Sequence, residues 1–149
     1  MLSTVGASVV LCGDVGAGNV TKLANQIIVA GNIAAMSEAF MFAQKAGVSV
    51  ELVFNAIKGG LAGSTVLNAK TPMILEGNFK PGFKVDLHIK DLKNVLKTAK
   101  ELNTSTFLTN QVLEMLQVLH NDGEGESDHS AIYKYYKKLA NLEVKSEDN

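Results

Sequence analysis

Four polar side chains lie at the beginning of a long apolar segment. Lys22, Asn25, Gln26 and Asn32 fall within roughly a 120° arc if the segment is an α-helix, in which each residue turns about 100°. The other side chains of the segment are mostly apolar, a pattern typical of a buried helix. Polar groups on such a helix need partners. One interpretation is that the lysine and the amides line a cleft, the kind of setting in which titratable side chains are often functional.

A second interpretation of Lys22 needs no chemistry. A lysine in the first turns of a helix can lay its aliphatic part along the apolar surface and keep its ammonium group in water. The residue types and their spacing are compatible with both interpretations.

The glycine-rich turn before this segment does not match a dinucleotide-binding fingerprint. That fingerprint is G-x-G-x-x-G after a strand, with an acidic residue about 20 positions later at the end of a second strand. Here the glycines are Gly13, Gly16 and Gly18, so the spacing is reversed. A helical pattern then continues to about Ala46 instead of a second strand. The residues therefore exclude a Rossmann nucleotide site at this turn.

The composition predicts one globular domain. The chain has 149 residues, of which 46% are hydrophobic and 19% charged, and its net charge is −1. This charge gives no electrostatic case for nucleic acid or a membrane surface. The single cysteine, Cys12, cannot form an internal disulfide, which favours a reducing compartment. Polar residues interrupt every apolar run before about 18 residues, and the first residues lack a basic signal-peptide region. We therefore expect neither a transmembrane helix nor a signal peptide.

Apolar periodicity and turn residues predict an all-α domain with one short strand. Residues 7–12 have the pattern of a strand, and the long helix follows the glycines. Ser49 is expected to cap a second helix, which ends at Gly59. A third helix is expected to start at residues 63–65, with Pro72 complicating its continuation before a loop at 76–82. The remaining helices are expected from Phe83 to Leu102, from Thr109 or Asn110 onward and, after a loop at 120–128, from Asp128 or Ser130.

Few other side chains in the sequence suggest chemistry. Lys90 lies off the apolar stripe of its helix, which is typical of a solvated face. His88 lies near that stripe and is expected to be a packing histidine, and Asp91 lies between the two. The three histidines, which include His120 and His129, lack metal-ligand spacing, so no metal site is predicted.

Four separated motifs resemble the β-hydroxyacid dehydrogenase family, which includes 3-hydroxyisobutyrate dehydrogenase. They cover residues 13–26, 34–39, 59–67 and 79–92. The glycine-rich third motif and the Asp-Leu-His-Ile-Lys-Asp-Leu run are most similar to the branch that reduces tartronate semialdehyde (2-hydroxy-3-oxopropionate). The resemblance extends over nearly the whole chain and implies an NAD(P)-dependent oxidoreductase acting on a CH–OH group.

The resemblance also implies that this chain is the second part of a two-domain enzyme. Residues 1–15 resemble the end of a Rossmann domain and a linker. Residues 16–144 resemble a helical C-terminal domain of the type found in 6-phosphogluconate dehydrogenase, and residues 145–149 are expected to be a frayed tail. The cofactor fingerprint has no counterpart here, so we expect the isolated chain to be inactive. NAD or NADP would be bound mainly by the other domain.

Individual residues take their expected roles from the matching positions of the family. Lys22 matches the catalytic lysine and Asn25 a neighbouring amide that contacts substrate. Lys90 matches a lysine that reaches the cofactor, with Asp91 beside it. The turn Gly60–Ser64 resembles a segment near the substrate carboxylate. A lysine at this position would donate the proton that the substrate oxygen needs when hydride is transferred to an aldehyde.

Other functions remain open at this point. The chain could belong to a 3-hydroxyisobutyrate dehydrogenase, with a β-hydroxy acid as substrate. It could instead be a non-catalytic helical module for oligomerisation, or a ligand-binding helical domain without a redox role. The expected partners are a small acid substrate, the enzyme's own Rossmann domain and further copies of the chain, and the expected location is the cytoplasm or an organelle matrix.

Overall fold

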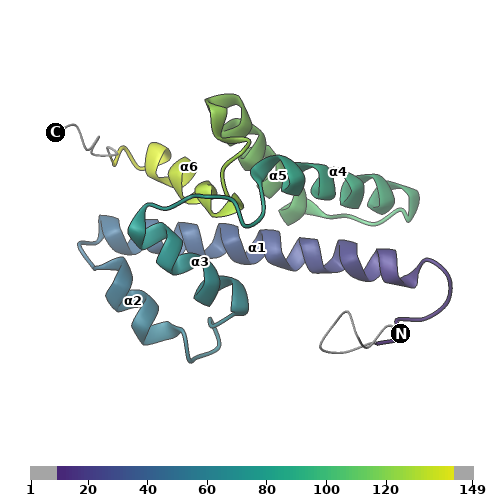
Figure 1. The fold of residues 1–149 in the computed structure, drawn as a ribbon, viewed down its shortest axis with the longest axis horizontal. Helices are drawn as coiled ribbons and strands as arrows, with labels where there is room; N and C mark the ends of the chain where they lie inside the picture. Colours follow the sequence, from purple (N-terminus) through teal and green to yellow (C-terminus); the bar gives the residue numbers. More distant parts are fainter. Residues whose placement is uncertain (1–9, 143–149) are drawn as a thin grey trace.

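The computed structural model describes residues 10–142, and within this range the fold is all-α. Figure 1 shows one long helix with the shorter helices arranged around it. The elements in chain order are α1 (Ala17–Lys45), α2 (Val50–Ile57), α3 (Thr65–Glu76), α4 (Val85–Glu101), α5 (Phe107–Leu119), the π-helical turn η2 (His120–Glu124), the 3₁₀ turn η3 (His129–Ala131) and α6 (Ile132–Leu139).

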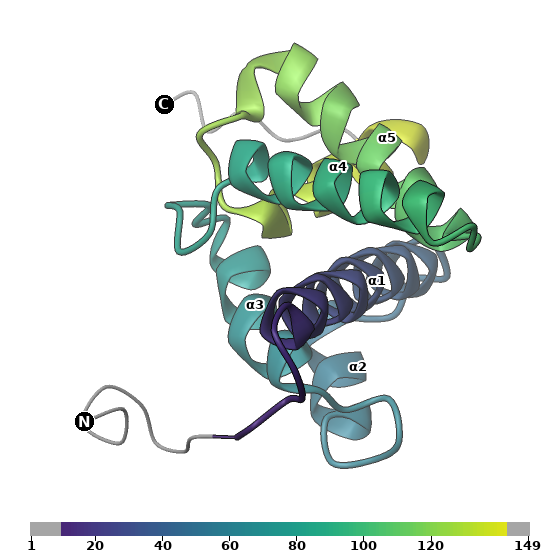
Figure 2. The same cartoon turned by 90° about the vertical axis from the view of Figure 1, so that its right-hand side faces the viewer.

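Helix α1 is the central element and contacts each of the other five α-helices. α4, α5 and α6 lie on one side of it, and α2 and α3 lie on the other (Figures 1 and 2). Gly16 precedes α1 with a φ of 96°, in the left-handed region that glycine adopts without steric cost. Gly47, with a φ of 79°, lies just beyond its other end, where the Val48 amide donates to the Ala43 carbonyl. Glycines at these two turns therefore delimit the helix.

Two apolar clusters on α1 form the core. The first joins the N-terminal half of α1 to α4, α5 and the start of α6, with Ile33, Leu92 and Leu116 among its most buried members. The second joins the C-terminal half of α1 to α2, α3 and α6 around Phe40, which is completely buried. The core thus fixes the position of α1 relative to α4, the helix that carries Lys90 and Asp91.

Helix α3 continues through Pro72 to Glu76. A proline inside a helix removes one backbone hydrogen bond, here the one to the Asn68 carbonyl. Both residues are exposed, so water can solvate that carbonyl. The start of α3 is well capped, because the Ser64 hydroxyl accepts a hydrogen bond of 2.9 Å from the Leu67 amide.

Three sequence predictions about the elements need correction or lie outside the described range. Residues 10–12 are exposed and are not in a strand, because the described residues offer them no partner strand. Residues 7–9 of the expected strand lie outside the described residues, as does the tail at 145–149. α5 begins at Phe107 rather than at 109 or 110. The prediction missed its first two residues because Phe107 and Leu108 are exposed and so do not follow the repeat of buried apolar residues. The expected loop at 120–128 begins with the helical turn η2.

The length and hydropathy of α1 would allow it to cross a membrane. Half of its most apolar stretch is buried against other helices. The central helix of a globular protein has the same properties, so this pattern does not by itself indicate a membrane span.

Candidate functional site

Lys22 lines a polar hollow of about 310 Å³ between the start of α1 and α4. Figure 2 looks toward this end of α1, with α4 crossing above it. The ammonium-bearing side chain is exposed, and two acidic and one further basic residue share the hollow with it. The lining consists of Asn19, Lys22, Leu23, Asp91, Asn94, Lys97, Thr98 and Glu101.

A hydrogen bond next to the hollow ties α1 to α4. The Gln26 amide donates to the Asp91 carboxylate over 2.5 Å, and Gln26 itself is only 7% exposed. Gln26 lies one helical turn after Lys22, on nearly the same face of α1. The bond therefore holds Lys22 opposite α4 and gives the buried Gln26 amide the partner that the sequence required.

Lys90 lies in a second hollow of about 650 Å³ on the other side of α4. Lys93, His120 and Asp86 line the same hollow, and the Asp86 carboxylate lies 2.7 Å from the His120 ring. Asn94 lines both hollows. The structure thus places Lys22 and Lys90 in adjoining hollows rather than in one.

The other three expected site residues do not line the Lys22 hollow. Asn25 is exposed on α1. Gly60 and Ser64 belong to the turn between α2 and α3, and the Ser64 hydroxyl caps α3. Among the described residues, the structure brings together Lys22 and Asp91 and leaves the Gly60–Ser64 turn elsewhere.

A buried ion pair that sequence reasoning did not find joins three segments. The Asp128 carboxylate is fully buried and lies 2.8 Å from the Lys70 ammonium group. It also accepts hydrogen bonds of 3.0 Å from the amides of Gly82, Phe83 and Ser130. Burial alone would raise the pKa of Asp128, but the hydrogen bonds from Lys70, Ser130 and Phe83 outweigh it and hold the pKa well below its usual range. Asp128, one of the two residues expected to cap the last helix, caps η3, the 3₁₀ turn that precedes α6, whereas the N-cap of α6 itself is Ala131.

Two histidines are buried next to this ion pair. The Nδ1 atoms of His88 and His129 lie 3.1 Å apart, and the Phe83 ring packs edge-on against both rings. Burial lowers the pKa of His88 to about 4. Burial, together with the neighbouring His88, lowers the pKa of His129 to about 3. His88 is thus buried, as its place near the stripe predicted, but it packs against a second histidine.

The histidine pair predicts a loss of stability in weak acid. Both pKa values lie below the ordinary value of 6.5, so below pH 6.5 the unfolded chain binds up to two more protons than the folded chain. The free energy of unfolding therefore decreases as the pH falls from 6.5 toward 4. Urea titrations followed by circular dichroism at pH 7.5, 6, 5 and 4.5 should show a steadily decreasing midpoint.

A variant identifies the source of this pH dependence. His129→Leu should weaken it by about half, since one of two protons is lost. The charges of Asp91, Asp128 and Lys70 also act on the pKa values of the pair. Whatever these groups contribute, an unchanged urea midpoint between pH 6.5 and 4.5 would contradict the prediction.

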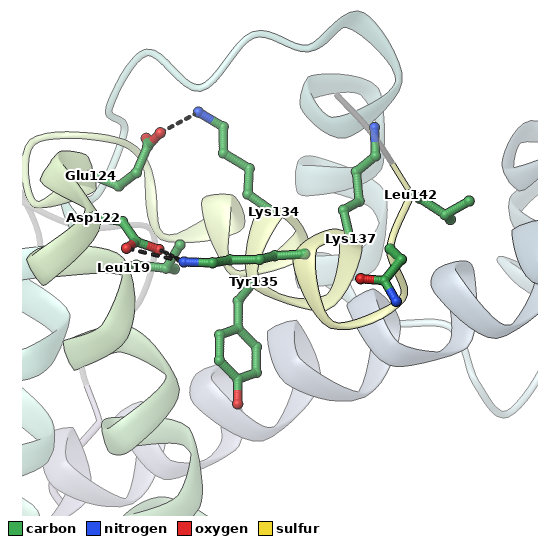
Figure 3. Close-up of a pocket in the computed structure, with 9 residues that line it drawn as sticks. Leu119, Asp122, Glu124, Lys134, Tyr135, Lys137 and Leu142 are labelled. Atoms are coloured by element: carbon green, nitrogen blue, oxygen red, sulfur yellow. Dashed lines mark hydrogen bonds and ion pairs between the residues drawn. The ribbon is translucent and has the colours of Figure 1, made fainter. Parts of the chain in front are cut away.

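A third hollow, of about 490 Å³, lies against α6. It shares no lining residue with the hollows of Lys22 and Lys90. Figure 3 shows the Lys134 ammonium group directed at Glu124. The Lys138 ammonium group pairs with Asp122. These ion pairs have lengths of 2.7 and 2.9 Å. Both acidic residues belong to η2, so the pairs connect this turn to α6. Helical periodicity does not indicate these pairs, because the partners are 10 and 16 residues apart.

No cluster of three or more metal-ligating side chains occurs among residues 10–142. Cys12 is exposed and is the single cysteine of the chain. The chemistry available to the described residues therefore centres on the exposed lysine in a polar hollow and on the basic hollow beside it.

The sequence of the helical domain matches a known family. Residues 16–136 match the family described as the NAD-binding domain of NADP-dependent 3-hydroxyisobutyrate dehydrogenase. The chain belongs to the 3-hydroxyisobutyrate dehydrogenase family. It represents the C-terminal domain of that family's enzymes, which are NAD(P)-dependent CH–OH oxidoreductases.

Known proteins that are similar to this chain support the same family assignment. The chain is 38% identical to 2-hydroxy-3-oxopropionate reductase from Escherichia coli, over 95% of this chain and 48% of the relative. It is 30% identical to 2-(hydroxymethyl)glutarate dehydrogenase from Eubacterium barkeri, over 97% and 48%. The crystal structure of Mycobacterium tuberculosis 3-hydroxyisobutyrate dehydrogenase with L-serine superimposes with a TM-score of 0.82 at 25% identity, over 89% and 48%. The chain spans about half the length of the relatives that it matches.

The match to the 3-hydroxyisobutyrate dehydrogenase family covers most of the residues that the structure describes. It begins at Gly16, just before α1, and ends at Tyr136 in α6. Both lysine hollows lie within it, as do the Asp128 ion pair and the histidine pair. The two relatives with named substrates act on different compounds, so family membership leaves the substrate of this chain open.

Proposed function

We propose that this chain is the substrate half of an NAD(P)-dependent reductase of small 2-hydroxy-3-oxo acids, with tartronate semialdehyde as its substrate. The observation that carries the proposal is the polar hollow in which Lys22 faces Asp91 across the junction of α1 and α4. An exposed ammonium group at an open rim can reach a ligand held by a second domain. The similarity to 2-hydroxy-3-oxopropionate reductase supports the choice of substrate.

In this proposal, Lys22 donates a proton to the substrate oxygen. Hydride transfer to an aldehyde leaves negative charge on the oxygen, and a positioned ammonium group both stabilises that charge and supplies the proton. Asn25, three residues further along α1, orients the substrate. The hydrogen bond between Gln26 and Asp91 fixes the part of α1 from which Lys22 projects.

The hollow beside Lys90 fits the charge of a nicotinamide dinucleotide. Lys90 and Lys93 line it, and two ammonium groups suit the negative phosphates of NAD or NADP. The cofactor supplies the hydride when bound. Asp91 adjoins Lys90 on α4, and its contact with Gln26 sets the orientation of this part of the helix toward the cofactor.

The turn Gly60–Ser64 is proposed to contact the substrate carboxylate. The Ser64 hydroxyl acts as an acceptor in its cap, so its proton remains available for donation to a carboxylate oxygen. We further propose that the complete enzyme is a homo-oligomer of the cytoplasm or an organelle matrix, and that residues 1–15 lead from a Rossmann domain into the helical domain at 16–144.

A domain fusion tests the proposed function. In this fusion, the first half of the E. coli 2-hydroxy-3-oxopropionate reductase precedes the chain and replaces the relative's own second half. We expect reduction of tartronate semialdehyde with oxidation of NADH or NADPH, measured by the loss of absorbance at 340 nm. The chain alone should show no turnover. A folded fusion that binds the cofactor but reduces neither this aldehyde nor a β-hydroxy acid series would contradict the proposal.

The main alternative is a 3-hydroxyisobutyrate dehydrogenase. The structural likeness to the M. tuberculosis enzyme favours testing it directly with the same fusion. Oxidation of 3-hydroxyisobutyrate at a higher kcat/KM than reduction of tartronate semialdehyde would assign the chain to that activity. A non-catalytic module would turn over neither substrate.

A further inference from the structure

The hollow of about 650 Å³ beside Lys90 contains a third side chain that can carry a positive charge. Lys90 and Lys93 line it from α4, and His120 lines it from the end of α5. Imidazole is the side chain that gains or loses its charge near neutral pH. The charged lining therefore consists of two ammonium groups, one imidazole and a single carboxylate, that of Asp86.

The other carboxylates near this hollow have partners outside it. Asp91 accepts a hydrogen bond from Gln26, and both acidic residues of η2 pair with lysines of α6. Within residues 10–142, no ion pair involves Lys90 or Lys93. The hollow therefore keeps an excess of positive charge, and such a site attracts an anion.

Asp86, the single carboxylate of the hollow, is held in place by Gly125. Its backbone amide donates a hydrogen bond of 3.1 Å to the Gly125 carbonyl. Its carboxylate fills the space in which another residue would have a side chain, because a Cβ added to Gly125 would lie 2.7 Å from both carboxylate oxygens. Asp86 also belongs to the first turn of α4, where the helix dipole favours a negative charge. The carboxylate thus has a defined position.

The Asp86 carboxylate in turn holds the His120 ring. Its Oδ1 atom lies 2.7 Å from the His120 Nδ1 atom. Because an ionised carboxylate only accepts hydrogen bonds, Nδ1 carries the proton of this bond, and Nε2 is left for another partner. When the ring is protonated, Nε2 also donates, and the positive charge strengthens a hydrogen bond to an anionic oxygen.

We propose that His120 binds a phosphate group of the nicotinamide dinucleotide together with Lys90 and Lys93, and that Asp86 positions His120 for this contact. The inference rests on the proposed function, in which this hollow receives the cofactor. A diphosphate offers several acceptor oxygens to the three cationic groups at once. The volume of the hollow lies in the ordinary range of small-molecule sites, about 300–1,000 Å³. The cofactor affinity then depends on the charge of one histidine.

Cofactor titrations of the domain fusion at pH 6, 7, 8 and 8.5, followed by NADPH fluorescence, test the role of His120. Affinity for NADPH should decrease as the pH rises and the imidazole loses its proton. His120→Gln should raise the dissociation constant at pH 6 by about 10-fold, as expected for a lost hydrogen bond to a charged group. His120→Arg keeps a permanent charge, so its affinity should stay high at every pH.

The variants separate His120 from other sources of pH dependence. A phosphate monoester such as the 2′-phosphate of NADPH titrates in the same range, so the contribution of His120 is the difference between the unmodified fusion and His120→Gln. Carboxylates and ammonium groups ordinarily keep their charge between pH 6 and 8.5. Those on the two elements around His120 are Asp86, Lys90, Lys93, Asp122 and Glu124.

A control variant in the same turn accompanies His120→Gln. Asp122→Asn changes a charged residue of η2 that does not line this hollow, and its affinity for NADPH should stay within a few-fold of the unmodified fusion at each pH. An affinity and a pH profile that His120→Gln leaves unchanged would overturn the proposal. Circular dichroism checks that each variant folds.

Asp86→Asn tests the positioning role, because charge and orientation predict opposite results. The substitution removes a negative charge from the hollow, which by itself would tighten the binding of an anion. If Asp86 holds His120 for the phosphate, the affinity should instead decrease, and this decrease should disappear in a fusion that already carries His120→Gln. Tighter binding by Asp86→Asn alone would overturn the positioning role.

The chain without a second domain provides an independent test, with inorganic pyrophosphate as the probe. In ¹H–¹³C NMR spectra, 10 mM pyrophosphate should shift the His120 ring signals, which His120→Gln identifies, and sodium chloride of equal ionic strength should not. The buried His88 and His129 are internal controls and should not shift. Absence of a His120 shift would overturn the phosphate site.

Competition in the fusion identifies the source of the phosphate. Pyrophosphate should displace NADPH, with a weaker effect in His120→Gln. Pyrophosphate that shifts the His120 signals of the chain but leaves NADPH bound to the fusion would assign the hollow to a free phosphate compound. That result would overturn the cofactor as the ligand of His120.

Failure of this inference and failure of the proposed function give different results, because the titrations measure binding rather than turnover. A fusion that reduces the aldehyde, with a cofactor affinity that His120→Gln leaves unchanged, would overturn the role of His120 alone. A fusion that binds NADPH with the expected pH dependence but reduces no substrate would contradict the proposed chemistry and support the His120 site.

Discussion

Replacing Lys22 with alanine in the domain fusion is expected to lower turnover by about 100-fold or more, the usual contribution of a general acid. The substituted enzyme lacks the ammonium group that is proposed to protonate the substrate oxygen. Cofactor affinity should change little, since Lys90 lies in the adjoining hollow. Single-turnover kinetics and a fluorescence titration with NADPH measure the two quantities separately.

Two further substitutions separate proton donation from charge. Lys22→Arg keeps the positive charge, but a guanidinium group does not release its proton near neutral pH, so turnover should remain low. Lys97→Ala removes another exposed lysine from the same hollow and is the matched control, with turnover within a few-fold of the unmodified fusion. Turnover that survives Lys22→Ala would refute the role of Lys22.

Replacing Asp128 with alanine is expected to destabilise the chain by about 3–5 kcal/mol, the range for breaking a buried ion pair. The change leaves the Lys70 ammonium group and the amides of Gly82, Phe83 and Ser130 without their acceptor. A domain of this size is stable by only about 5–15 kcal/mol. Thermal and urea unfolding followed by circular dichroism should therefore show a large loss, or no folded protein.

The exposed ion pairs provide the control for Asp128. Asp122→Ala removes the partner of Lys138, and pairs open to water contribute about 1 kcal/mol or less. This variant should unfold close to the unmodified chain. If the two aspartate substitutions cost the same, the buried network would not have the structural role assigned to it.

Local pattern was sufficient to predict most helices. α1 and α4 end within one or two residues of the positions that their apolar repeats and flanking glycines indicated, because both helices bury one continuous side. The apolar pattern failed where residues are helical but not buried, or where a helical segment is polar. Phe107 and Leu108 are helical but exposed, and the turn at His120 is helical but polar.

Contacts between distant segments could not be predicted from one sequence. Periodicity places Asp91 on a helix face, but it does not show that Gln26, 65 residues earlier, is its partner. The same holds for Lys70 and Asp128, which are 58 residues apart. For the site, the residues indicated a lysine in a cleft and the resemblance supplied its role. Neither indicated that Lys22 and Lys90 occupy separate hollows.

The single unbroken course of α1 has a consequence for the Lys22 hollow. Lys22 projects from the first turns of this helix, and the same helix contributes Ile33 to one apolar cluster and Phe40 to the other. A change that loosens either cluster would therefore also shift the end of the helix from which Lys22 projects.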